Sequence, residues 1–433
     1  MKRVLILLAA GVCAQAAIYD VRQYGAKGDG HTKDTAAIQK AIQTCAKAGG
    51  GTVLVPPGRY FIGTIHLRSN VRLDIEAGAT LLGSTEPEDY PLVASPWKDG
   101  QEIASLIRAE KAENIAITGR GTIDGQGEAW WKRQRLLKPK SKTPPPAVED
   151  ARKEIAKIAH GRPHLIKLVN CKHILLEGLT LLNSPSWTVN PVFSEFITVR
   201  GLTLVNPPDS PNTDGINPES CRNVHISDCN IDVGDDCVTI KSGTDEIGRR
   251  VGRVCENITV TNCTMVHGHG GVVIGSEMSG GAKNVTVSNC VFQHTLRGIR
   301  IKSQRGRGGV VEGVTASNIV MEDVQTPISI SMYYSGGKDE APQPVGEGTP
   351  LFRDISLSNI LARGAKVAGE ILGLPEMPIQ GVTLDNVRIS GEKSFVIRHA
   401  KDIGFHRTRI EVKSGAPVVQ EDVTGFDSDT GRR

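Results

Sequence analysis

Three aspartates lie in two short motifs that contain glycine. Asp214 is part of Asn212-Thr-Asp-Gly215, and Asp235 and Asp236 are part of Gly234-Asp-Asp-Cys237, so Asp214 and Asp235 are 21 residues apart. Two carboxyl groups on opposite sides of a glycosidic bond can hydrolyse it, one acting as an acid and the other as a base. The motifs therefore predict a hydrolytic site, provided that the fold brings them together.

Most of the chain repeats a short alternating strand followed by a turn residue. Equivalent aliphatic residues are spaced by 23, 27, 34, 27 and 29 residues, at Ile174, Ile197, Val224, Ile258, Val285 and Val314. These intervals are too short for a crossover helix with a second strand and loops, but they suit stacked coils of strands. We therefore predict an all-β fold, a right-handed parallel β-helix. An antiparallel propeller would need a hairpin turn in every unit.

Stacking would gather polar motifs from consecutive coils on one face, because neighbouring strands lie about 4.7–4.9 Å apart. After the aspartates come His269, in Gly268-His-Gly270, and then Arg300 and Lys302, which project together because they are two residues apart on a strand. Asp235 and Asp236 would face opposite ways on a regular strand, so we expect Gly234 to bend the chain there. Turn capping and surface ion pairs could explain each motif by itself. They explain poorly why four polar motifs fall on consecutive coils.

The segments that flank the coils differ from them in pattern. Asp34 is predicted to cap a helix with apolar residues at Ile38, Ala41, Ile42 and Cys45, and this short helix would close the first coil. Residues 133–164 form an insertion, with a charged helical run at 148–159, which either overhangs the groove or is a solvated excursion. Strand patterning weakens over 389–423, and 427–433 form a polar tail. We expect residues 17–433 to be one domain.

Residues 1–16 have the pattern of a signal peptide. Lys2 and Arg3 precede an apolar run over residues 4–12 and then Ala14-Gln-Ala16. We expect the protein to be exported, either to the periplasm or out of the cell. Removal of the peptide lowers the formal net charge from +4 to +2, which is too weak to favour nucleic acid. No other stretch is long enough to span a membrane, and we expect a monomer.

Export would leave eight cysteines, most of which fall at repeated positions. One set of three and a second set of three should each stack on successive coils as small apolar ladders: Cys171, Cys221 and Cys255, then Cys229, Cys263 and Cys290. Stacked cysteines would also be close enough for disulfides, and their pairing stays open. We expect no metal site and no cofactor.

The polar motifs occur in this order in glycoside hydrolase family 28, the polygalacturonases, which the chain resembles over nearly its whole mature length. Further shared motifs are Tyr24-Gly-Ala-Lys-Gly-Asp-Gly30, Gly121-Thr-Ile-Asp-Gly-Gln-Gly127, Trp130-Trp131 and Asn183-Ser-Pro-Ser-Trp187. The resemblance implies an inverting hydrolase that cleaves α-1,4-galacturonosyl linkages in pectin. Its substrate would be a pectic polysaccharide or an oligogalacturonide.

The resemblance also implies a role for each site residue. Asp235 would be the general acid, and Asp214 and Asp236 would activate the attacking water. Such a reaction needs carboxyl groups about 6.5–9.5 Å apart and a raised pKa on the acid, which its carboxylate neighbours would supply. His269 would orient the substrate or tune the acid. The residues expected to bind substrate are Asn212, Arg300, Lys302 and either Tyr333 or Tyr334.

Several alternatives stay open. Members of the family that cleave rhamnogalacturonan generally depart from the Gly268-His-Gly270 and Arg300-Ile-Lys302 motifs, so we favour homogalacturonan. The Glu277-Met-Ser-Gly280 stretch and the insertion resemble exo-acting bacterial members, and we favour exo over endo action. A calcium-dependent pectate lyase would share fold and substrate. A non-catalytic glycan-binding β-helix would bind through aromatic residues, which make up only 4% of this chain.

Overall fold

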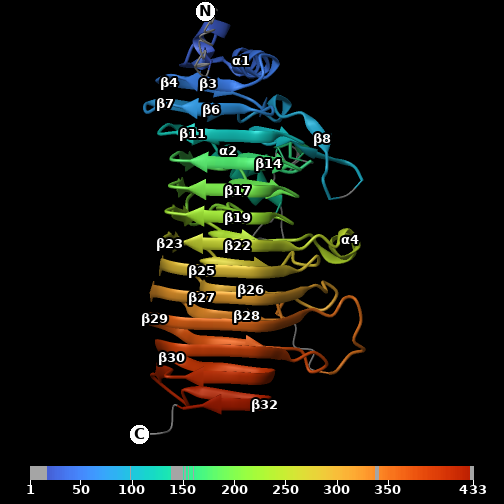
Figure 1. The fold of residues 1–433 in the computed structure, drawn as a ribbon, viewed down its shortest axis with the longest axis vertical. Coiled ribbons are helices and arrows are strands. Elements are labelled where there is room, and N and C mark those ends of the chain that lie inside the picture. The colour runs from blue at the N-terminus through green and yellow to red at the C-terminus, as the bar shows by residue number, and fades with distance from the viewer. Residues whose placement is uncertain are drawn as a thin grey trace, which may run out of the picture.

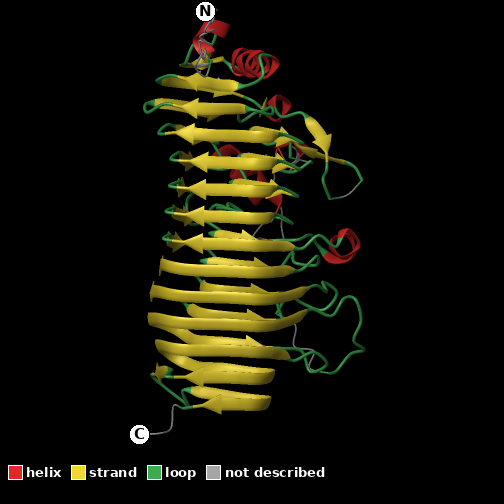
Figure 2. Ribbon diagram, viewed as in Figure 1, coloured by secondary structure: helices red, strands yellow, loops and turns green. Residues whose placement is uncertain are grey.

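The fold is a solenoid in which strands of successive coils pair side by side along one axis (Figure 1). The computed structural model describes residues 17–97, 99–137, 160–336 and 341–429, together with positions 150, 153, 154 and 156–158. Strands dominate, and the few helices lie at one end or at the side (Figure 2). The predicted right-handed parallel β-helix is confirmed.

Each coil contributes a strand to up to three faces, which we call F1, F2 and F3. F1 contains β1 (Ile18–Asp20), β3 (Gly51–Val55), β6 (Val71–Ile75), β11 (Glu113–Gly119), β14 (Lys172–Glu177), β17 (Glu195–Arg200), β19 (Arg222–Ser227) and β22 (Cys255–Thr261). F2 contains β2 (Asp29–Lys33), β4 (Gly58–Ile62), β7 (Ala79–Gly83), β12 (Thr122–Asp124), β15 (Thr180–Leu182), β18 (Thr203–Val205), β20 (Asn230–Val233) and β23 (Thr264–His267).

F3 carries the candidate site. It contains β5 (Ile65–His66), β10 (Ile107–Glu110), β13 (Ile166–Val169), β16 (Val189–Val192), β21 (Val238–Ile240), β24 (Val272–Gly275), β26 (Arg297–Lys302) and β28 (Thr326–Ser331). Towards the C-terminus, longer strands turn corners without a break and join the faces: β25 (Ala282–Gln293), β27 (Val310–Glu322), β29 (Leu351–Leu372) and β30 (Ile379–His406). β31 (Arg409–Val412) and β32 (Val418–Ser428) complete the last coil.

The repeated aliphatic residues set the register of F1. Ile174 pairs with Ile197, and the same register continues through Val224, Ile258, Val285 and Val314. All six side chains are almost fully buried. Because alternate residues of a strand face opposite sides, the coils bury one aliphatic side chain per position and leave the next one facing outwards. The predicted stacking of the repeats is therefore confirmed.

Cysteines occupy buried repeat positions of their own. Among the described residues, all eight cysteines are free and buried, so the structure contains no disulfide there. Cys229, Cys263 and Cys290 directly precede residues that pair with one another on F2, as the repeat positions predicted. They fill the core as small apolar side chains.

The N-terminal end is closed by a helix, as predicted. The four apolar side chains expected on the inner face of α1 (Thr35–Lys47) are fully buried. Asp34 does precede the helix, but its carboxylate accepts hydrogen bonds from the backbone N–H groups of Lys27 and Gly28, at 2.7 and 3.0 Å, instead of capping α1. Asp34 therefore ties the preceding loop to the helix.

One prediction on the flanking segments is wrong, and two others lie largely outside the described residues. Asp427 and Ser428, assigned to a polar tail, pair with β30 as the end of β32, where Phe426 packs against Phe405 with ring centroids 5.5 Å apart. The insertion begins inside α2 (Glu128–Leu137), whereas most of the predicted helical run at 148–159 lies outside the described residues. The predicted signal peptide, residues 1–16, also lies outside them. Within the part of the chain that the structure describes, no helix is long and apolar enough to cross a membrane.

The remaining elements project from the side of the solenoid. They are the antiparallel hairpin of β8 (Leu92–Ala94) and β9 (Gln101–Ile103), the helix α4 (Asp245–Val251), and the short 3-10 helices η1 (Val21–Tyr24) and η2 (Pro87–Asp89). Figure 1 shows β8 and α4 on the same side of the stack. Glu102 and Ile103 of β9 line a pocket together with Trp187 and Asn212.

Candidate active site

The three aspartates lie in the corner connections that lead into F3. Asp235 and Asp236 lie between β20 and β21, and Asp214 lies in the coil before them. Backbone hydrogen bonds hold these connections in register, from Gly215 N to Asp236 O at 3.0 Å and from Cys237 N to Gly270 O at 2.8 Å. Because the aspartate pair stands in a turn and not on a regular strand, both side chains reach the same groove, as we had expected from Gly234.

The carboxylates form a compact, buried cluster. One oxygen from each of Asp214, Asp235 and Asp236 lies within 4.8 Å of the others. Asp214 is 2% exposed and Asp236 is 1% exposed, whereas Asp235 is half-buried. Three acids this close repel one another in their charged forms, so the surrounding cations and donors decide which of them holds a proton.

Asp214 is held by an amide and an ammonium group. Its Oδ2 accepts a hydrogen bond from Asn217 Nδ2 at 3.0 Å and lies 3.6 Å from Lys241 Nζ. Lys241 is itself buried and donates to Glu277 Oε2 at 2.9 Å. Burial raises the pKa of Asp214 to about 7, with the neighbouring aspartates adding to the effect and Lys241 opposing it.

Asp235 is paired with His269. The imidazole Nδ1 and the carboxylate Oδ1 are 2.9 Å apart. Burial raises the pKa of Asp235, but the hydrogen bond and charge of His269, with Lys302 and Lys241, outweigh it, so that pKa lies below its ordinary value. The hydrogen bond to Asp235 raises the pKa of His269. The expectation that carboxylate neighbours raise the pKa of Asp235 was therefore wrong. It did not include the direct contact between His269 and Asp235, which lowers that pKa.

Asp236 is held by the two cations of β26. Lys302 Nζ donates to Asp236 Oδ2 at 2.8 Å, and Arg300 Nη1 lies 3.9 Å from Oδ1. Oδ1 itself is buried and has no hydrogen-bond partner among the described residues. This oxygen can therefore accept a proton from a water molecule in the groove.

The glycines on either side of His269 leave room for the cluster. A Cβ on Gly268, whose φ is +77°, would lie 2.4 Å from the carbonyl oxygen of Asp235. A Cβ on Gly270 would lie 2.3 Å from Val273 Cγ2 and 3.2 Å from Asp236 Oδ1. Only a residue without a side chain fits at these positions, which is why the histidine can pack so closely on the aspartates.

The two candidate tyrosines differ in their surroundings. The ring centroid of Tyr334 lies 5.2 Å from Lys302 Nζ and 6.0 Å from Arg300 Cζ, and the residue is 44% exposed. Tyr333 is partly buried against the core and contacts Arg398 instead, at 5.3 Å. Of the two alternatives, the geometry therefore brings Tyr334 to the predicted cation pair.

A pocket of about 390 Å³ adjoins Asp214 on its N-terminal side. Its lining includes Arg162, Lys167, Trp187 and Asn212. Trp187 links it to the aspartates, because Lys241 Nζ lies 4.4 Å from the centre of the tryptophan ring. Of the predicted site residues, Asn212 belongs to this pocket, where its Oδ1 accepts a hydrogen bond from Arg162 Nη2 at 2.8 Å.

Comparison with known proteins identifies the family of the chain. Residues 45–406 match the family model for glycosyl hydrolases family 28. The chain belongs to this family. It is 33% identical to a probable polygalacturonase of Vitis vinifera over 84% of this chain and 73% of that protein. The crystal structure of a hyperthermoactive exopolygalacturonase from Thermotoga maritima is 31% identical, with a TM-score of 0.80 over 93% of each chain. The Yersinia enterocolitica family 28 exopolygalacturonase is 26% identical, with a TM-score of 0.81 over 95% of this chain and 78% of that one.

Sequence reasoning missed three residues that lie at this candidate site. Lys241 follows the aspartate pair on F3, and alternation with the buried Val238 and Ile240 could have placed it on the outer side with Thr239. Glu277 was noted only as part of a motif, and nothing in the sequence indicated its ion pair with Lys241. Arg162 lies at the end of the insertion and offers no local pattern.

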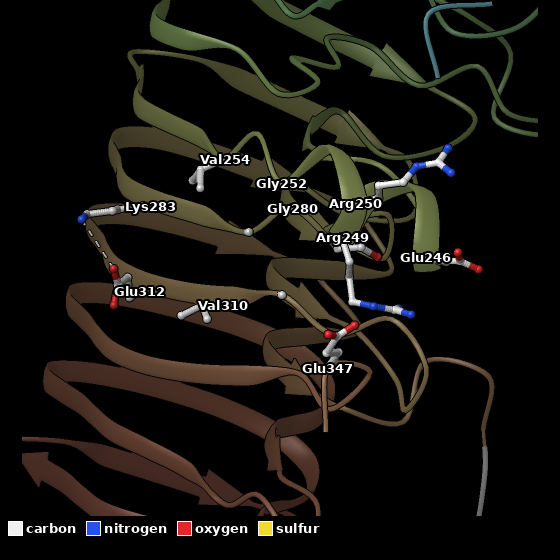
Figure 3. A pocket seen from close by; sticks show the side chains of 13 residues that line it. Glu246, Arg249, Arg250, Gly252, Val254, Gly280, Lys283, Val310, Glu312 and Glu347 are labelled. Atoms are coloured by element: carbon white, nitrogen blue, oxygen red, sulfur yellow. Dashed lines mark ion pairs between the residues drawn. The ribbon is translucent and has the colours of Figure 1, made fainter. Parts of the chain in front are cut away.

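A second cavity of this glycosyl hydrolase, among its described residues, is separate from the aspartates. A pocket of about 670 Å³ lies beside α4 and is lined by residues that include Arg249, Lys283, Glu312 and Glu347 (Figure 3). None of the predicted site residues lines it. Its charged groups are of both signs, and Lys283 pairs with Glu312 at 3.6 Å. This pocket offers no convergent group for catalysis.

The aspartate cluster is also the one group of His, Cys, Asp and Glu side chains, among the described residues, whose spacing would suit a metal ion. Two ammonium groups already lie against it, Lys302 at 2.8 Å from Asp236 and Lys241 at 3.6 Å from Asp214. A calcium site needs six to eight oxygen ligands. The ammonium groups of Lys241 and Lys302 take up positions next to the carboxylates and supply no oxygen ligand, so the cluster does not fit a calcium site.

Proposed function

We propose that this family 28 enzyme is an inverting polygalacturonase that cleaves α-1,4-galacturonosyl linkages and acts from the end of its substrate. The observation that carries the proposal is the junction of the three carboxylates with Arg300 and Lys302 on adjacent coils. Carboxylates supply the acid and the base, and the cations supply partners for an acidic sugar.

The Asp235–His269 pair is the proposed acid. A proton held in their 2.9 Å contact can pass to the glycosidic oxygen when the substrate enters and displaces solvent. Asp236 is the proposed base, because its Oδ1 is buried and lacks a protein partner. Asp214, on the preceding coil, would hold the same water from a second side.

Inversion rests on the family resemblance and not on the spacing. One oxygen from each of the three carboxylates lies within 4.8 Å of the others. The separation of about 6.5–9.5 Å that is general for inverting enzymes is measured between whole carboxyl groups, so the oxygen distances do not decide between inversion and retention. Proton NMR of the first anomer released from the substrate tests this part of the proposal directly. A product formed with the configuration of the substrate would contradict inversion.

Arg300 and Lys302 are the proposed partners of the uronate carboxylate. Arg300 is partly exposed in the groove, and its planar guanidinium can bind a carboxylate with two hydrogen bonds. Lys302 lies next to it and already neutralises Asp236. Tyr334, which is exposed beside both cations, provides an apolar surface for the same sugar.

Exo action is supported by the two solved structures with TM-scores of about 0.8, since both are exopolygalacturonases. Curated relatives include exo- and endo-acting enzymes alike, so product analysis is the deciding test.

We further propose that residues 1–16 direct export to the periplasm or the outside of the cell, and that residues 17–433 act as one domain and as a monomer. Amino-terminal sequencing and light scattering of the purified protein test these points.

The experiment is a time course on polygalacturonate in excess chelator, with the wild type and Asp235→Asn compared at equal concentration. Saturated mono- or digalacturonate from the first time points, lost in the variant, supports an exo-hydrolase that uses Asp235. A ladder of shrinking oligomers indicates endo action. Unsaturated products that absorb in the ultraviolet, or turnover that needs calcium, would indicate a lyase. Turnover of rhamnogalacturonan alone would replace the proposed substrate.

A further inference from the structure

Arg162 lies at the groove without a carboxylate partner. Its Nη1 donates to the backbone oxygens of Pro185 and Pro211, both at 2.7 Å, and its Nη2 donates to Asn212 Oδ1 at 2.8 Å. All three acceptors are neutral. Among the described residues, no Asp or Glu oxygen lies within ion-pair distance of this guanidinium.

Other cations in the same part of the groove have acidic partners. Lys167, in the same pocket, donates to Glu102 at 2.6 Å. Lys241 and Lys302 contact Glu277 and Asp236 at 2.9 and 2.8 Å. Arg162 therefore differs from its neighbours in having a fixed position and no anion.

The guanidinium also has donors to spare. Arginine has five N–H groups, and the three hydrogen bonds leave the Nε–H and one Nη2–H without a partner among the described residues. Burial lowers the pKa of Arg162 to about 10, opposed by the charge of Asp214, so the group stays cationic at neutral pH. A carboxylate from outside the chain would supply the missing counter-ion.

We propose that Arg162 binds the carboxylate of the uronate unit on the opposite side of the scissile bond from Arg300 and Lys302. The pocket that it lines lies on the N-terminal side of Asp214, whereas β26 lies on the C-terminal side of Asp236. A substrate that spans the aspartates along the solenoid axis therefore meets a cation on each side. This inference rests on the proposed function and assigns Arg162 to substrate specificity.

A purely structural role for Arg162 makes a different prediction. Its hydrogen bonds join the end of the insertion to the loops at Pro185 and Pro211, so a variant that only loosens these loops should weaken binding of every ligand alike. A carboxylate partner should matter only when the ligand is charged. The test is therefore the preference of the enzyme for trigalacturonate over its methyl ester.

Binding is measured by calorimetry in the Asp235→Asn background, which prevents turnover. The Arg162→Gln substitution should weaken binding of trigalacturonate about 10- to 100-fold and leave the Kd of the methyl ester nearly unchanged. The reason is that only the free carboxylate of trigalacturonate forms charged hydrogen bonds with Arg162, so only this ligand loses them. Arg162→Lys keeps the charge but cannot form the paired hydrogen bonds, so its Kd for trigalacturonate should lie between those of the parent protein and of the Arg162→Gln variant. Arg135→Gln is the matched control, since Arg135 is exposed on α2 and pairs with Asp209.

Equal weakening of acid and ester, or no change for either, overturns the inference while the proposed function stands. If Arg162→Gln does not fold, as judged by its thermal transition, Arg162→Lys carries the same comparison. If Asp235→Asn with Arg162 intact binds no galacturonate oligomer and the wild type turns none over, the proposed function fails, and this inference fails with it.

Discussion

Lys241 Nζ lies 3.6 Å from Asp214 Oδ2 and 2.9 Å from Glu277 Oε2, so one buried ammonium serves two carboxylates. Burial alone would lower the pKa of Lys241, but the charges of Glu277 and the aspartates raise it above its ordinary value. Lys241 is therefore cationic at neutral pH. Glu277 competes with Asp214 for the ammonium group of Lys241, so the strength of the Lys241–Glu277 ion pair sets how much Lys241 stabilises the charged form of Asp214.

Variants of Lys241 and Glu277 should shift the pH profile in opposite directions. Lys241→Met removes the charge that favours ionised Asp214, so its pKa should rise above about 7 and the acid limb of kcat/KM should move to higher pH. Glu277→Gln frees the ammonium for Asp214, so the limb should move to lower pH. Initial rates on polygalacturonate between pH 4 and 9, at constant ionic strength, measure both shifts. Shifts of the same sign would contradict this coupling.

Asp214→Asn should make the protein less active but more stable above neutral pH. Burial raises the pKa of Asp214 from 3.8 to about 7, so between these values the folded state holds a proton that the unfolded state has lost. The free energy of unfolding of the wild type therefore falls as the pH rises across this window, by an amount on the order of 2–4 kcal/mol. Urea unfolding at pH 4 and pH 8 should show a smaller fall in the variant. An equal fall in both proteins would argue against a buried, protonated Asp214.

Substitution of the two tyrosines should separate binding from stability. Tyr334→Ala should raise KM severalfold with little change in Tm, because the residue is 44% exposed and contacts Arg300 and Lys302. Tyr333→Ala should lower the stability by about 2–4 kcal/mol, because its ring packs against the core. Steady-state kinetics and thermal unfolding on both variants decide the point. The reverse pattern would assign the site to Tyr333.

A single methyl group at Gly270 should disturb the base. In Gly270→Ala the new Cβ would meet Val273 at 2.3 Å and Asp236 at 3.2 Å, so the carboxylate must move from its position beside Lys302. We expect kcat to fall at least tenfold, since displacements of about 1 Å are costly in catalysis. Gly346→Ala is the control, because a Cβ there meets no atom within 4 Å. Full activity of Gly270→Ala would show that Asp236 does not depend on this close packing.

The strand register was predictable because the equivalent aliphatic residue can be recognised in each repeat of the sequence. Ile258 and Val285 occupy the same place in successive units, and parallel stacking puts such residues side by side whatever the loops do. The inner face of α1 was predictable for a similar reason, since its apolar residues follow the helical period. The same stacking brings the four polar motifs to one groove.

What the sequence could not supply are contacts between side chains of different coils. The 2.9 Å contact of His269 with Asp235 helps to hold the pKa of that carboxyl below its ordinary value, and no local pattern encodes that distance. Lys241 and Arg162 were missed because their partners come from other coils or from backbone oxygens. The end of β32 was misassigned because polar Asp427 and Ser428 join the last coil through their backbone pairing with β30.

The pairing of each coil with its neighbours in sequence also bears on how the chain assembles. Val285 pairs with residues 27 before and 29 after it, so in 433 residues the relative contact order of strand pairing is about 0.07. Values this low are typical of helical bundles and not of β-sandwiches, whose strands must find distant partners. We therefore expect folding to nucleate locally and to propagate from coil to coil. The aspartates and their cations, which fall between residues 214 and 302, can then be assembled before either end of the chain has docked.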